Sequence, residues 1–127
     1  MNSKKIPLNK YHFVCFKIRV QYWIDYFGLR EWLCSFEFED NDEMHARVWY
    51  DLESYTCKFY LAKNFNDSIE EKLETYIDKC AFHEVFHLLL SEFSSLASKR
   101  YCTQSQLDAA EEKFVRKMEN LVWNKLV

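Results

Sequence analysis

Hydrophobic residues near the start of the chain recur at every third or fourth position. The repeat consists of Phe13, Phe16, Val20, Trp23 and Phe27. This spacing places the side chains on one face of an α-helix, so we expect a first helix from about Asn9 to Phe27. Gly28, the single glycine of the chain, comes directly after this segment. Helices commonly end with a residue in the left-handed backbone conformation, which glycine adopts readily.

Three later segments alternate between apolar and polar residues, which is the period of a β-strand with one buried face. The core-facing positions are Trp32, Cys34, Phe36, Phe38, Ala46, Val48, Tyr50, Cys57, Phe59 and Leu61. Polar turns at Asp40 to Glu43 and around Glu53-Ser54 separate the segments. The pattern predicts a three-stranded antiparallel meander.

Helical periodicity returns after the strands. Ser68 and Glu71 have the spacing of a capping box, so we expect a second helix to begin at Ser68. A helix running on to Lys99 would be longer than a domain of this size, which places its end or a bend among Ser91, Ser94, Ser95 and Ser98. A last helix should begin at Thr103 or Gln104, with an inner face of Leu107, Ala110, Phe114, Met118, Leu121 and Val122.

These elements predict an α+β fold in a single domain over residues 1–127. Aromatic residues make up 18% of the chain, which is typical of a folded core, and the net charge of −3 with mixed signs argues against a nucleic-acid partner. No apolar run is long enough for a membrane span, and none follows the N-terminal lysines as in a signal peptide. Five dispersed cysteines without a C-x-x-C pair favour reduced thiols and a cytoplasmic location.

The segment from Cys80 to Leu90 contains an HExxH motif, His83-Glu84-Val85-Phe86-His87. Residues four apart share a helix face, so His83 and His87 can present two imidazoles to one metal ion. Glu84 is placed to act as a base without being a ligand. The plainer alternative is two core histidines bonded to backbone carbonyls, but it explains neither the spacing nor Glu84.

A catalytic zinc ion needs a third protein ligand. The metzincin pattern is excluded, because Leu90 and Phe93 occupy the positions of its glycine and third histidine. His12 and His45 are more typical of surface or satisfied histidines.

On the last helix, Glu111 falls inside the apolar stripe and Glu112 at its polar edge. A glutamate directed into a core requires a partner. Glu111 is therefore the expected ligand, and Glu112 is the alternative.

With these features the sequence resembles the zincin metallopeptidases, and more closely the short phage-encoded zincin-like proteins. The likeness covers nearly the whole chain: a first helix with Tyr22-Trp23, then Trp32, three strands, HEVFHLLL and a final helix with EEKFVRKMENL. It implies a minimal zincin-like fold, Zn²⁺ bound by His83 and His87, Glu84 as general base and a glutamate ligand from the last helix. Thermolysin-like zincins carry an aspartate four residues after that glutamate, where this chain has Val115. A partner for the ligating histidines must then come from elsewhere, such as Asp78, Asp108 or a backbone carbonyl.

The expected function is hydrolysis of peptide bonds by a metal-activated water with Glu84 as base. The strand Thr56–Ala62 is the expected edge for an extended peptide or protein substrate, and Tyr101 and Tyr60 are candidate oxyanion donors. Neither nucleic acid nor membrane is an expected partner. Two alternatives are a catalytically silent zinc-binding protein of phage origin that binds a host factor in the host cytoplasm, and a hydrolase of non-peptide amides such as cell-wall material.

Overall fold

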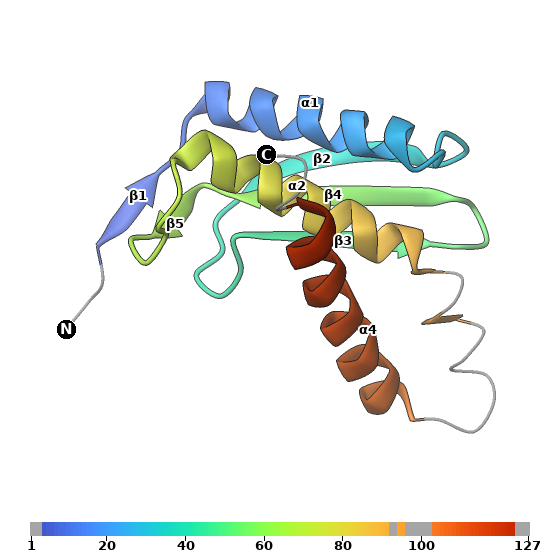
Figure 1. Ribbon diagram of the computed structural model, residues 1–127. Coiled ribbons are helices and arrows are strands. Elements are labelled where there is room, and N and C mark those ends of the chain that lie inside the picture. Colours follow the sequence, from blue (N-terminus) through green and yellow to red (C-terminus); the bar gives the residue numbers. More distant parts are fainter. Residues whose placement is uncertain (1–3, 92–93, 96–102, 124–127) are drawn as a thin grey trace.

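A computed structural model describes residues 4–91, 94–95 and 103–123 of the 127-residue chain (Figure 1). Its elements in chain order are β1 (Lys5–Pro7), α1 (Lys10–Tyr26), β2 (Leu33–Glu39), β3 (Ala46–Asp51), β4 (Thr56–Ala62), β5 (Asn64–Asn66), α2 (Leu73–Leu89), α4 (Gln104–Met118) and the π-helical segment η1 (Glu119–Trp123). The α+β class is confirmed. Within the described residues, no helix is both long and apolar enough to cross a membrane.

Helix α1 matches its predicted range and ends. The Asn9 side chain accepts a hydrogen bond from the His12 backbone N–H at 3.1 Å, and the His12 side chain accepts one from the Asn9 N–H. His12 is therefore part of a helix cap. Gly28 has φ +69°, the left-handed conformation expected where the helix ends.

The three long strands form a mixed sheet, so the predicted antiparallel meander is wrong. Their order is β2-β4-β3, with β2 parallel and β3 antiparallel to the central strand β4. The core-facing residues were predicted correctly, because Cys57, Phe59 and Leu61 of β4 are buried. Alternation identifies the buried face of a strand but carries no information on the direction of its neighbour. It also did not reveal the small antiparallel sheet of β1 and β5.

Helix α2 begins at Leu73, so the predicted capping box at Ser68 is wrong. Ser68 instead donates hydrogen bonds from its backbone N–H and its hydroxyl to the Asn66 side chain. Lys72 precedes the first turn without a side-chain cap, and the helix ends with Leu90 as its cap, just before Ser91. Ser98 lies outside the described residues.

Helix α4 begins as predicted. The Thr103 side chain caps its N-terminus and forms a capping box with Gln106. Of the predicted inner face, Leu107 is buried and Met118 and Val122 are half-buried. The side chains of Ala110, Phe114 and Leu121 lie outside what the structure describes.

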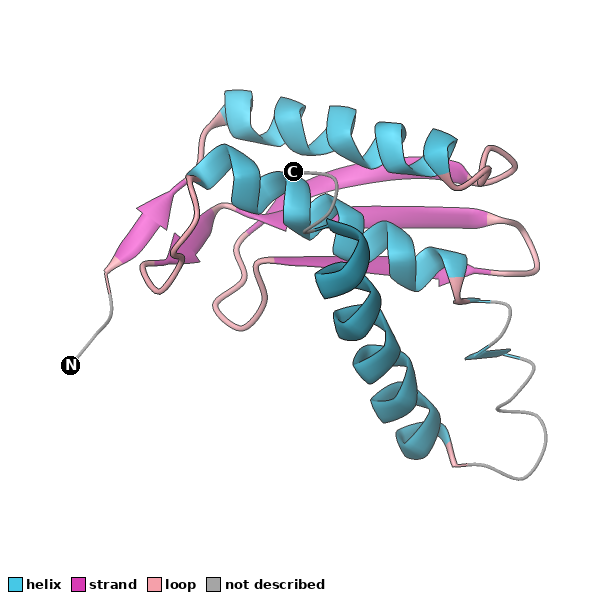
Figure 2. Ribbon diagram, in the orientation of Figure 1, coloured by secondary structure: helices cyan, strands magenta, loops and turns pink. Residues whose placement is uncertain are grey.

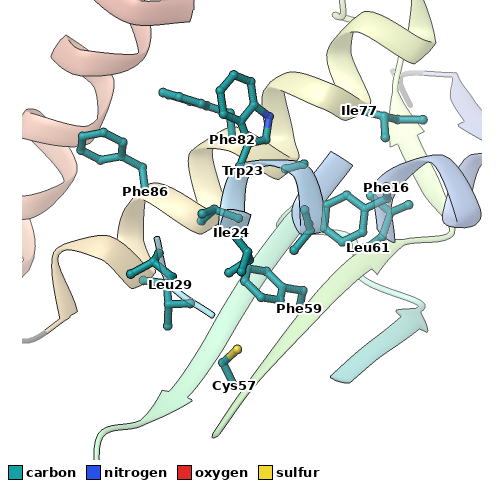
Figure 3. Packing of buried hydrophobic residues seen from close by; sticks show 14 of the residues in the cluster. Phe16, Trp23, Ile24, Leu29, Cys57, Phe59, Leu61, Ile77, Phe82 and Phe86 are labelled. Carbon is teal, nitrogen blue, oxygen red and sulfur yellow. The ribbon is translucent and has the colours of Figure 1, made fainter. Parts of the chain in front are cut away.

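The hydrophobic core lies between the sheet and the helices α1 and α2, which run along one side of the strands (Figure 2). Aromatic side chains join the two helices. The ring centroids of Trp23 and Phe82 are 4.8 Å apart (Figure 3). Those of Phe27 and Phe86 are 5.7 Å apart. Trp123 of η1 packs against Trp23 and Phe82. The core thus holds α2 firmly, while α4 extends away from the sheet (Figure 1).

Candidate metal centre

One face of α2 lines an open cavity of about 990 Å³ between α2, α4 and β3. Tyr76, Cys80, His83 and His87 follow one another at helical spacings of four, three and four, so their side chains project to the same side. The opposite face of α2 packs into the core. The amphipathic pattern of α2 therefore directs the two histidines of the HExxH motif into the cavity.

The Nε2 atoms of both histidines converge on a single carboxylate, that of Glu112. The distance from Nε2 of His87 to Oε2 of Glu112 is 3.0 Å, and that from Nε2 of His83 to Oε1 is 3.4 Å. One ligand atom from each of the three residues lies within 4.8 Å of the other two, a grouping that could hold a metal ion. Among the described residues it is the only such group of three or more.

The other ring nitrogen of each histidine, Nδ1, contacts a different carboxylate. Nδ1 of His83 is 2.9 Å from Oε2 of Glu119, and Nδ1 of His87 is 3.1 Å from Oε1 of Glu111. The side chains of Glu119 and Glu111 are only 13% and 11% exposed. When Nδ1–H donates to these carboxylates, the Nε2 lone pairs remain available to a metal, which is the usual support of a ligating histidine.

The electrostatics of the site favour a cation. Burial opposes the charged form of both histidines, but the hydrogen bonds that they donate to Glu119 and Glu111, together with the charge of Glu84, raise the pKa of His83 and of His87 above the ordinary value. Four carboxylates surround two imidazoles, so the cluster gains from added positive charge. Two nitrogen donors and one oxygen donor are a set that suits Zn²⁺ and leaves a coordination position open, so the residues fit this ion.

Glu84 follows His83 on α2 and lines the same cavity while being only 8% exposed. Burial raises its pKa to about 7; the charges of His83 and His87 oppose this shift, and those of Glu112 and Glu119 add to it. No described residue forms a hydrogen bond with its carboxyl group. A carboxyl group with a pKa near neutrality can both accept and release a proton.

The prediction of Glu111 as third ligand differs from this arrangement, in which Glu112 joins the histidines. Glu111 does face inward, between the buried residues Leu107 and Val115, as its helical phase indicated. That inward direction leads to Nδ1 of His87 and not to the two Nε2 atoms. Glu112 is 36% exposed at the edge of the stripe, which is where a site open to substrate must lie.

Several other predicted residues have structural roles. Asp78 accepts a hydrogen bond from the Trp23 indole at 3.0 Å, and Asp108 accepts one from the Gln104 amide at 2.7 Å. Neither supports a histidine. His45 lines the cavity, but its Nδ1 is 2.7 Å from the Tyr76 hydroxyl and its Nε2 accepts from the Asn66 N–H, so both nitrogens are engaged.

The structure places Tyr60, one of the two predicted oxyanion donors, outside the cavity, and it corrects the predicted substrate edge. The Arg47 guanidinium stacks on the ring of Tyr60, with its Cζ atom 3.7 Å from the ring centroid. Tyr60 does not line the cavity. Tyr101 lies outside the described residues. The cavity is lined instead by Tyr50 and Tyr76. Strand β4 is central in the sheet, and the edge strand beside the cavity is β3.

No model of a known protein family, no curated protein sequence and no solved structure matches the chain significantly. Function is therefore inferred from the geometry of the site and the chemistry of its side chains.

Proposed function

We propose that the protein is a zinc-dependent peptidase, with His83, His87 and Glu112 as the metal ligands. The observation that carries the proposal is that the two ring nitrogens of each histidine contact different carboxylates. Nε2 of both faces Glu112, while Nδ1 is held by Glu119 in one case and Glu111 in the other. This is the arrangement of a metal site whose histidines are oriented by outer carboxylates.

Zinc, when bound by these residues, would polarise the scissile carbonyl and lower the pKa of water, so that water can lose a proton and attack the carbonyl carbon. Glu84 accepts the proton of the attacking water and delivers it to the leaving nitrogen. Its burial and its pKa of about 7 suit both transfers near neutral pH. Because Glu84 is not one of the three converging ligands, it remains available for this role.

The strand β3 offers an extended peptide a place to bind. In the described sheet it pairs with β4 on one side only, and it contributes Ala46, Val48 and Tyr50 to the cavity. A substrate strand that added to this edge would pass across the ligand cluster.

Tyr50 is the best-placed donor to the developing oxyanion. Burial and the nearby charges of Glu111 and Asp108 raise its pKa, which keeps the hydroxyl protonated. No described residue forms a hydrogen bond with that hydroxyl, whereas Tyr76 already contacts His45.

The decisive experiment measures zinc content and cleavage of a peptide library on the same purified protein. We expect about one zinc per chain and peptide cleavage in the wild type. Glu84→Gln should keep the zinc and lose roughly 10²- to 10⁴-fold in rate, the range for removal of a general base. Loss of zinc in Glu84→Gln would show that Glu84 is a ligand and would overturn the assigned roles.

A matched pair of tyrosine variants tests the oxyanion donor. Tyr50→Phe should lower kcat by about 10²-fold or more with zinc content unchanged. Tyr60→Phe, outside the cavity, should leave kcat unchanged. Equal rates in the two variants would remove Tyr50 from the mechanism.

One observation favours the alternative of a zinc-binding interaction protein. The outward face of α1 exposes a run of large side chains, Tyr11, Val14, Ile18, Tyr22 and Tyr26. Such a stripe suits contact with another protein, as a host-directed phage factor would need. This alternative predicts bound zinc without cleavage of any peptide, whereas a cell-wall hydrolase would cleave peptidoglycan fragments and leave casein intact.

A further inference from the structure

Two cysteines lie opposite each other on neighbouring strands, away from the candidate metal centre. Cys34 of β2 and Cys57 of β4 are register partners in the parallel pairing, and their Sγ atoms are 3.3 Å apart. Neighbouring strands are separated by about 4.8 Å, which is within the range of Cα separations that disulfides bridge. Only a small movement of the two side chains is needed to bring the sulfurs into bonding distance.

The two thiols differ in exposure and in chemical character. Cys34 lies half-buried on the edge strand β2, while Cys57 is buried at the margin of the core beyond Phe59 (Figure 3). The Cys57 thiol donates a hydrogen bond to Cys34 Sγ, which lowers the pKa of Cys34 and, together with burial, raises that of Cys57. Cys34 is therefore the more accessible thiol and the nucleophile, and Cys57 is the thiol placed to attack a mixed disulfide at Cys34.

We propose that Cys34 and Cys57 form a reversible disulfide by exchange with a low-molecular-weight disulfide such as glutathione disulfide. The Cys34 thiolate attacks one sulfur of glutathione disulfide, forming a mixed disulfide and releasing one glutathione thiolate. Cys57 then loses its proton and attacks Cys34 Sγ, which releases the second glutathione. The two protein thiols are oxidised, one glutathione disulfide is reduced to two glutathione thiols, and the two thiol protons pass to the released glutathiones.

The bond would join the edge strand β2 to the central strand β4. Neither cysteine lines the cavity of the candidate metal centre, so the proposal is independent of the proposed peptidase activity. Closing this loop restricts the unfolded chain, and oxidation should raise Tm by roughly 5–10 °C. The pair would thus link two strands of the sheet covalently under oxidising conditions and release them under reducing conditions.

The test incubates the full-length protein in glutathione buffers of increasing oxidised fraction, followed by acid quenching, alkylation and peptide mapping by mass spectrometry. We expect a species lighter by the mass of two hydrogen atoms, with the bond mapped to Cys34 and Cys57 and reversed by reduced glutathione. Cys57→Ser should accumulate a mixed disulfide at Cys34. Cys15→Ser, a matched change on α1, should oxidise like the wild type.

Two results would overturn the proposal. One is a folded wild-type protein in which no bond between Cys34 and Cys57 forms, even with glutathione disulfide alone. The other is a bond that maps to a different pair, including any pair with Cys102. Because the mapping is performed on the wild type, the outcome does not depend on whether the serine variants fold.

Discussion

Helices α2 and α4 meet at the candidate metal centre but are held in place by different forces. The buried side of α2 is apolar apart from Glu84, and its rings pack against α1 at Trp23 and Phe27. Among the described side chains of α4, only Leu107 and Val115 are buried. What otherwise joins α4 to α2 in the site is contact between carboxylates and histidines.

This difference assigns a distinct role to each helix. Helix α2 presents His83, Glu84 and His87, and its opposite face is packed into the hydrophobic core. Helix α4 and η1 bring Glu111, Glu112 and Glu119 to them, and mutual repulsion among these carboxylates opposes the approach unless positive charge lies between them. The position of α4 should therefore depend on whether a cation occupies the proposed site, while the position of α2 should not.

The largest effect is expected when the histidines are removed from α2. His83→Ala or His87→Ala deletes one proposed ligand and also leaves Glu119 or Glu111 without its histidine partner. Zinc affinity should fall about a thousand-fold, which corresponds to the contribution of one ligand to the binding free energy of a typical zinc site. Peptide cleavage should disappear. Competition with a coloured chelator measures the affinity.

His12→Ala is the matched control for these variants, because His12 only caps α1. It should bind zinc as the wild type does. Normal zinc affinity in His83→Ala and His87→Ala would instead show that the metal, if any, binds elsewhere.

The next effect separates the glutamates of α4 and η1. Glu112→Gln removes the negative charge of the proposed ligand and should weaken zinc binding about a hundred-fold or more. Glu111→Gln and Glu119→Gln disturb only the support of a histidine, so losses of about ten- to hundred-fold are expected. If Glu111→Gln weakened zinc binding more than Glu112→Gln, α4 would be rotated from its described orientation.

Removal of the metal should loosen α4 while leaving the remainder of the fold intact. Hydrogen exchange measured with and without a chelator, at a pH high enough for both histidines to be neutral, should show about ten-fold faster exchange or more over 104–118. Neither a metal ion nor a protonated imidazole then offsets the repulsion among the carboxylates. The amides of α1, the C-terminal half of α2 and β4 should change little. Uniform acceleration across all of these elements would mean that the metal stabilises the whole fold equally.

The sequence predicted the part of the site on α2 better than the part on α4 and η1. The HExxH spacing predicted correctly that His83 and His87 share one face of α2, because local periodicity determines this, and Glu84 lies beside that face on the buried side of the helix. The partner glutamates depend on how α4 crosses α2, which local periodicity does not report. Glu111 was thus correctly expected to point inward. Glu112, on which both histidines converge, had been given only as the alternative ligand, and the role of Glu119 was not anticipated.

The sheet shows the same contrast between local pattern, which was predicted, and long-range pairing, which was not. The inward-facing residues of β2, β3 and β4 were predicted, since alternation depends only on the strand itself. The insertion of β4 between the other two depends on long-range pairing. Cys34 and Cys57 became neighbours only through that pairing, which is why their spacing in the sequence gave no sign of it.

The smallest effect is expected at Arg116, which marks the exposed side of α4. Its Nε lies 3.2 Å from Oε1 of Glu112, one helical turn away, but its side chain is 72% exposed. An ion pair in water contributes little, so Arg116→Ala should change the free energy of unfolding by no more than about 0.5 kcal/mol. Zinc affinity should change less than about three-fold, because the histidines and not Arg116 bring Glu112 into the cluster. Urea unfolding and chelator competition on the same preparation measure both quantities. A ten-fold loss of affinity would instead make Arg116 a positioning residue for Glu112, and the exposed side of α4 would then contribute to the site as its buried side does.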